Sequence, residues 1–141
     1  MTRKCTEFML WNHVFILYEV YQSFYYAEYL LFILSSITTI LSYYRHFYNE
    51  RVCNHCEPYF AKGTELYMTT MSVCLFQSSD ILILLCLKLF MIFIWKMESY
   101  NFEFIHPWLH IVVAMDAHYY LYCYSRILQP WQPHIYELLS E

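Results

Sequence analysis

The chain has 141 residues, of which 60% are hydrophobic and 14% charged, and its formal net charge is -4. Average globular chains carry about 25% charged residues, so this composition excludes an ordinary water-soluble domain, and the lack of a basic surplus excludes nucleic acid as an expected partner. Gly occurs once, at Gly63, which is too few turn formers for a many-stranded fold. The sequence therefore predicts an all-α, integral membrane helical bundle of three to four spans, forming one domain over residues 1–141.

The first half of the chain contains two apolar stretches followed by a polar one. Residues 8–24 are apolar on average but interrupted by Asn12, His13, Glu19 and Gln22, so this stretch either spans the membrane or lies in its interface. Residues 25–44, with Glu28 as the single charged residue, predict a span. If both stretches span, the turn near Ala27 has to be very tight. Residues 45–65 contain the first Pro and the only Gly, and predict a polar loop outside the membrane.

The second half begins with an apolar run over residues 66–97, which is too long for one upright span. We expect a tilted helix with an interfacial lead-in, a span at 74–97, and a bend or opening near Asp80. Lys88 lies within this run, where it either reaches toward the interface or faces the bundle. Another span is predicted at 104–124, followed by a C-terminal tail at 125–141.

The predicted span at 104–124 also carries histidines, although it contains no Lys or Arg. His106 and His110 are four residues apart, so a helix projects both imidazoles from one face, one turn apart. This is metal-ligand spacing, and ionisable groups at membrane depth usually face a polar interior. The alternative is that both histidines form hydrogen bonds across helices or lie near the interface.

A second pair of polar residues has the same spacing at the end of the 25–44 stretch. Ser42 and His46 lie on one face if the helix continues for one more turn. Together with Asp80 and the later histidine pair, the order along the chain is Ser-x-x-x-His, then Asp, then His-x-x-x-His. Ser42 can equally form a hydrogen bond to its own helix backbone or pack as a small interface residue.

This ordered set resembles the signature of the CREST superfamily of membrane hydrolases and receptors. FQSSDILILLCLKLF is similar to the third-span region of its post-GPI-attachment phospholipase and myomaker branch, and NFEFIHPWLHIVVA is similar to the final span of that branch. The segment Cys56-Glu57-Pro58, which follows His55, is similar to a loop cluster of the same branch. The family has seven spans, and the spans between its Asp helix and its last His helix are absent here, as in a truncated relative.

The resemblance implies a zinc-dependent lipid ester or amide hydrolase of lipid metabolism, with or without retained activity. In the family three histidines hold zinc, while an Asp and a Ser flank its bound water. Carried over to this chain, the implied metal ligands are His46, His106 and His110, with His55 as the alternative first ligand. Asp80 would act as general base, and Ser42 would orient the water or stabilise an oxyanion.

The other class of function left open is a non-enzymatic membrane scaffold or a subunit of a larger complex. Its partners would be membrane lipids and copies of the same or another chain, bound through transmembrane helices. Cys53 and Cys56, with His55 between them, supply three ligands where a zinc knuckle needs four, so a solvated loop or a redox pair is the expected interpretation of that motif.

Overall fold

In a computed structural model of the chain, residues 7–48 and 51–128 are described, without the side chains of residues 7–11. All regular structure within these ranges is helical, which confirms the predicted all-α class. The elements are α1 (Glu7–Tyr25), α2 (Tyr29–Tyr43), the π-helical turn η1 (Tyr44–Tyr48), α3 (Arg51–Leu75), α4 (Ser78–Met97) and α5 (Phe102–Leu128).

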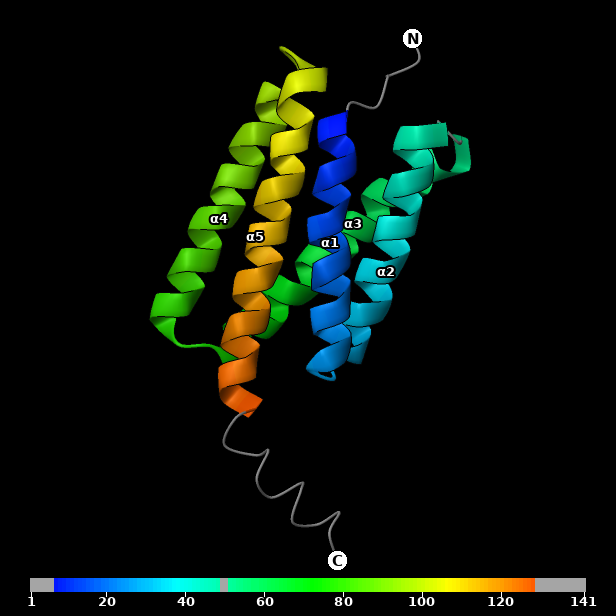
Figure 1. Ribbon diagram of the computed structural model, residues 1–141. Coiled ribbons are helices and arrows are strands. Elements are labelled where there is room, and N and C mark those ends of the chain that lie inside the picture. The colour runs from blue at the N-terminus through cyan, green and yellow to red at the C-terminus, as the bar shows by residue number, and fades with distance from the viewer. Residues whose placement is uncertain (1–6, 49–50, 129–141) are drawn as a thin grey trace, which may run out of the picture.

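The helices form a bundle in which neighbours along the chain run in alternating directions, with α3 crossing behind the others (Figure 1). α5 packs against α1 on one side and α4 on the other, while α2 packs against α1 and α3. A smaller contact joins α3 to α5. As a result, the end of α2 and the start of α5 lie at the same end of the bundle, the upper one in Figure 1.

The turn between α1 and α2 is as tight as two adjacent spans would require. Ala27 adopts a left-handed backbone conformation with φ 58°, and the Glu28 amide donates to the Ser23 carbonyl at 2.9 Å. This 6→1 hydrogen bond with a left-handed residue is the pattern of a Schellman helix end. α1 therefore reverses into α2 within three residues.

The stretch 45–65, predicted to be a polar loop, is instead almost entirely helical, and it supplies η1 and most of α3. The reason lies in its polar residues: Glu57, Thr64 and Ser72 are buried, and their spacings of seven and eight residues place them on one face of the helix. Pro58 lies inside α3 without ending it. A polar composition usually indicates a solvent-exposed loop, whereas this helix packs part of its polar face against other helices.

The long apolar run at 66–97 is divided between two helices. α3 ends at Leu75 and α4 begins at Ser78, so the predicted opening near Asp80 lies at the start of α4, and the predicted span 74–97 is shortened at its first end. α5 continues through the first four residues of the predicted tail. The remainder of that tail, 129–141, lies outside the described residues.

Lys88 faces the bundle interior rather than the interface. Its ammonium donates to Asp116 Oδ2 at 2.7 Å and to Glu65 Oε2 at 2.7 Å, so this α4 side chain links α5 and α3. The Asp116 side chain is fully buried. An ion pair therefore ties three helices together across the bundle.

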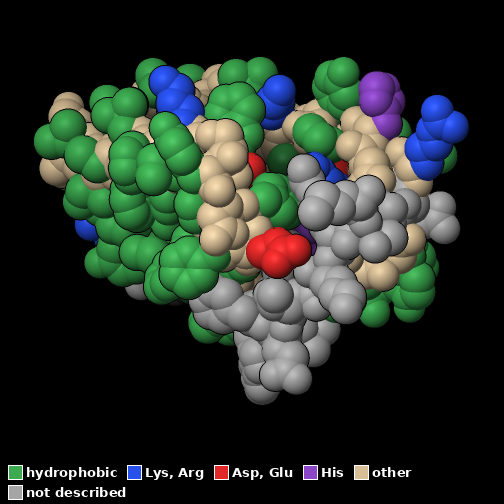
Figure 2. Space-filling view, turned by 90° about the horizontal axis from the view of Figure 1, so that it is seen from above, with side chains coloured by type: hydrophobic (Ala, Val, Ile, Leu, Met, Phe, Trp, Pro, Cys, Tyr) green, Lys and Arg blue, Asp and Glu red, His purple; other side chains and the backbone are tan. Residues whose placement is uncertain are grey.

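The distribution of polar and apolar side chains is the reverse of that in a water-soluble domain. Among the described residues, more polar or charged side chains are buried than hydrophobic ones, and large hydrophobic side chains are exposed on every long helix. Figure 2 shows hydrophobic side chains covering the side on which α4 lies. Of the described helices, only α4 is both long and apolar enough to cross a membrane.

Candidate metal centre

Three imidazoles converge where η1 meets the start of α5. His106 Nε2 lies 3.2 Å from His46 Nε2 and 3.1 Å from His110 Nε2, and one ring nitrogen from each of the three histidines lies within 4.8 Å of the others. Zinc–nitrogen bonds of about 2.0–2.1 Å in tetrahedral geometry place neighbouring ligand atoms about 3.3–3.4 Å apart. The two separations from His106 are close to that value and the third lies within 4.8 Å, so these residues are compatible with a tetrahedral metal ion.

Local helix geometry explains how the three ligands reach one another. His106 and His110 lie one turn apart on α5, as their spacing predicts, and both are buried. His46 lies in the five-residue π-helical turn that continues α2. π-helical turns are rare and frequently occur at functional sites. The structure therefore brings His46, one of the two predicted first ligands, to the pair on α5.

A carboxylate orients the central histidine of this group. Glu98 follows the last residue of α4, and its Oε1 lies 2.6 Å from His106 Nδ1. Because an ionised carboxylate can only accept, Nδ1 carries the proton and Nε2 presents its lone pair to the other two histidines. Metal-ligating histidines commonly have such a carboxylate on their second nitrogen. The sequence analysis did not identify Glu98, which lies in the short polar connection after α4.

Ser42 lies beside the histidines but contacts a fourth one. Its hydroxyl is 3.4 Å from His13 Nε2, and the His13 ring centroid lies 5.5 Å from that of His110 and 6.3 Å from that of His46. Both Ser42 and His13 are buried. His13 was not predicted as a site residue, because it has no helical i, i+4 spacing to another histidine. The signal that could have identified it is a polar side chain within an apolar stretch.

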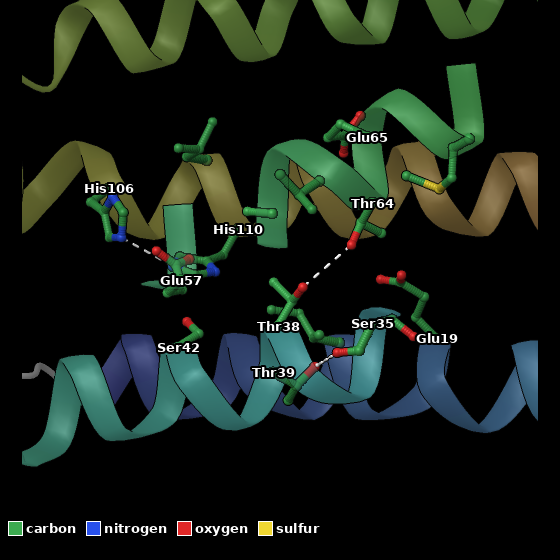
Figure 3. Close-up of a pocket in the computed structure, with 15 residues that line it drawn as sticks. Glu19, Ser35, Thr38, Thr39, Ser42, Glu57, Thr64, Glu65, His106 and His110 are labelled. Atoms are coloured by element: carbon green, nitrogen blue, oxygen red, sulfur yellow. Dashed lines mark hydrogen bonds between the residues drawn. The ribbon is translucent and has the colours of Figure 1, made fainter. Parts of the chain in front are cut away.

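An acid and a base from neighbouring elements adjoin the same region. Arg45, next to His46 in η1, forms an ion pair with Glu57 of α3. Glu57 lines a cavity together with Ser42, His106 and His110, and Figure 3 shows it beside the two histidines of α5. The helix that the sequence predicted as a loop thus contributes a carboxylate to the wall of this cavity.

Asp80 does not join the histidines. Its carboxylate accepts from the Tyr119 hydroxyl at 3.0 Å and from Arg126 Nη2 at 2.5 Å. Tyr119 lies nine residues after His110 on the same helix, which corresponds to about 13 Å along its axis. The structure therefore does not support the predicted role of Asp80 as a general base at this centre. Asp80 instead ties the start of α4 to the end of α5.

The motif around His55 also lies away from the centre. His55 is exposed on α3 and its ring contacts that of Tyr59, with centroids 5.7 Å apart. Cys53 and Cys56 are free thiols on the same helix. Of the two candidate first ligands, the geometry favours His46 over His55.

The Asp80→Asn variant is expected to lower the unfolding midpoint, because Arg126 and Tyr119 lose a charged acceptor. Thermal unfolding of the protein in detergent measures the effect. Glu103→Gln, the same acid-to-amide change at an exposed position on α5, is the control and should leave the midpoint unchanged. Equal midpoints for the two variants would contradict the anchoring role of Asp80.

Comparison of the chain with known protein families, with curated proteins and with solved structures finds no match.

Proposed function

We propose that this chain is a membrane-embedded helical bundle whose three histidines hold a zinc ion, and that it hydrolyses an ester or amide bond of a lipid. One observation carries the proposal: His106 Nε2 lies 3.1 Å from His110 Nε2 on the same helix and 3.2 Å from His46 Nε2, which comes from η1. The resemblance to CREST hydrolases in the order of these residues supports it.

The surface of the protein supports the membrane part of the proposal. An exposed apolar exterior around a polar interior suits a lipid environment, where ionisable groups face the bundle and pair with one another. α4 meets the length and composition of a span. The pairing of Lys88 with Asp116 inside the bundle follows the same rule.

The donor set supports zinc over other cations. Neutral imidazole nitrogens suit zinc, and three protein ligands leave a fourth position open, as in catalytic rather than structural zinc sites. The Glu98 carboxylate holds the Nδ1 proton of His106 and so fixes the tautomer whose Nε2 can bind the metal.

The remaining groups suit the handling of a lipid substrate. Bound zinc would supply a Lewis acid that lowers the pKa of water to about 7. A groove of about 600 Å³ reaches His106 from the side of α3 and α4. Trp95 and Leu109 give it an apolar wall for an acyl chain, and Lys62 supplies a positive charge for a headgroup. Ser42, in the adjoining cavity, can donate a hydrogen bond to a substrate oxygen.

Metal content and lipid turnover test the proposal together. The purified chain in detergent should contain one zinc per molecule by elemental analysis, and it should release fatty acid or headgroup from mixed-lipid vesicles in a manner that a chelator abolishes. Protein that purifies without zinc and binds none on titration would overturn the proposal.

A second candidate, a non-enzymatic membrane subunit that binds metal, is favoured by one observation. Asp80, the acid that the family uses beside its metal, is engaged with Arg126 and Tyr119. Zinc binding without turnover of any lipid class would favour this candidate over the hydrolase.

The Glu98→Gln variant should weaken zinc binding about 10- to 100-fold, the range found when the carboxylate behind a ligating histidine is removed. Competition titration with a chromogenic chelator measures the dissociation constant. Glu103→Gln, an exposed acid-to-amide change, should keep the affinity of the unmodified protein. A Glu98→Gln protein with full affinity would show that Glu98 has no part in orienting His106.

A further inference from the structure

A second polar region lies in the cavity of about 130 Å³ that the histidines border. At the end away from His106 and His110, side chains from α1, α2 and α3 surround it, and Figure 3 shows them facing one another across the open space. The polar residues at this end are Glu19, Ser35, Thr38, Thr39, Thr64 and Glu65, and each of their side chains carries oxygen. Apolar side chains, among them Ile16 and Met68, also line the cavity.

The hydroxyl groups here offer the cavity acceptors rather than donors. A serine or threonine hydroxyl has one proton to donate and two lone pairs, and all four of these hydroxyls donate to backbone carbonyls four residues earlier on their own helices. The donor-to-acceptor pairs are Ser35 to Leu31 at 2.7 Å, Thr38 to Leu34 at 2.8 Å, Thr39 to Ser35 at 2.6 Å and Thr64 to Phe60 at 2.9 Å. Their lone pairs remain available for an electron-poor ligand.

Glu19 is the buried group whose partner is missing. Glu19 is 3% exposed, and Figure 3 shows its carboxylate extending into the cavity. No described residue forms a hydrogen bond or ion pair with it. Burying an ionised carboxylate without a partner carries a large free-energy penalty, which is relieved by a proton on Glu19 or by a ligand that supplies donors or positive charge.

The neighbouring ion pair does not supply that charge. Lys88 forms ion pairs with both Glu65 and Asp116. Its single positive charge is therefore already shared by two carboxylates and does not balance Glu19. Glu65 Oε1 and Asp116 Oδ1 are both buried without a hydrogen-bond partner in the described structure. The group of four side chains is therefore short of positive charge.

We infer that the Glu19 end of this cavity is a binding site for a sodium ion. Carboxylate and hydroxyl oxygens are hard ligands, which suit alkali and alkaline-earth cations rather than zinc or copper. A cavity of this size also admits several waters, at about 30 Å³ each, which can complete the coordination of the ion. This site is distinct from the nitrogen-lined zinc centre and does not depend on it.

The number of acids favours a singly charged ion. Calcium sites use several carboxylates close together. Among the described residues, the histidines are the only three metal-ligating side chains whose ligand atoms lie within 4.8 Å of one another. Two carboxylates, those of Glu19 and Glu65, line this cavity together with neutral hydroxyls, which matches the weaker field that a monovalent cation requires.

Sodium dependence of thermal stability tests this inference. The purified full chain in detergent is heated in sodium chloride and in N-methyl-D-glucamine chloride at equal ionic strength. The midpoint should be higher in sodium, because a ligand at 100 times its dissociation constant lowers the unfolding constant about 100-fold. In Glu19→Gln, which removes the charge but keeps the shape, sodium and N-methyl-D-glucamine should give the same midpoint.

Two control variants distinguish sodium binding at Glu19 from a general effect of surface charge and from metal binding at the histidines. Glu103→Gln, at an exposed position, and His110→Ala, which removes a zinc ligand, should both retain the sodium response. Broadening of the ²³Na resonance by the unmodified protein, absent with Glu19→Gln, gives a direct readout that does not require unfolding. Equal midpoints in both salts for the unmodified protein, or stabilisation by acid alone with no sodium response, would overturn the inference.

Discussion

The His110→Ala variant is expected to lose zinc binding, with an affinity reduced by more than about 100-fold. Removing a ligand should exceed the 10- to 100-fold effect of removing a carboxylate behind a ligand. His110 Nε2 lies 3.1 Å from His106 Nε2, and its side chain is buried against the other histidines. Without it, two imidazoles remain and the site can no longer supply the three protein ligands of a catalytic zinc centre. Metal content per protein and competition titration measure the loss.

His55→Ala is the matched control for that experiment. His55 is exposed on α3 and is not among the three converging histidines, so its replacement should leave zinc content and affinity unchanged. The elution volume of both variants in detergent shows whether the bundle is intact. Full zinc content in His110→Ala, or an equal loss in His55→Ala, would contradict the centre described above.

The Lys88→Met variant is expected to have the largest effect on stability, a loss of about 3–5 kcal/mol, because breaking a buried ion pair leaves charges without compensation. Lys88 Nζ lies 2.7 Å from both Asp116 and Glu65, and methionine keeps much of the side-chain volume. Chemical or thermal unfolding in detergent measures the change.

Lys96→Met provides the same substitution at an exposed position near the end of α4 and should change stability little. Adding Asp116→Asn to Lys88→Met should recover part of the loss, since it removes one of the carboxylates left uncompensated. If Lys88→Met and Lys96→Met unfold alike, the ion pair contributes nothing to holding α3, α4 and α5 together.

Short-range spacing was enough to predict part of this site. In a helix, residues four apart share a face, which applies to His106 and His110 and to Ser42 and His46. Both pairs could therefore be predicted from local helix formation alone. The all-α class followed similarly from long apolar runs with one glycine. The sequence could not choose between His46 and His55, since that choice depends on how α2 and α5 approach each other.

The rest depended on contacts between residues far apart in sequence. α3 looked like a loop because its polar side faces Arg45, Thr38 and Lys88 on other elements, and these pairings decide whether a polar helix is stable. Asp80 forms an ion pair with Arg126, which belongs to the segment predicted as the C-terminal tail. His13 reaches Ser42 only because α1 reverses tightly into α2. Spacing along the sequence does not predict contacts of this kind.

The π-helical turn at Tyr44–Tyr48 makes the centre sensitive to chain length as well as to residue type. Such a turn holds one residue more than an α-helical turn closed by the same kind of hydrogen bond. Deleting Tyr44, ahead of His46 in this turn, would allow regular α-helix to resume and would move His46 to a different position around the helix axis. His46 would then point elsewhere with all three histidines still present, so shortening the chain by one residue could silence this centre as effectively as removing an imidazole.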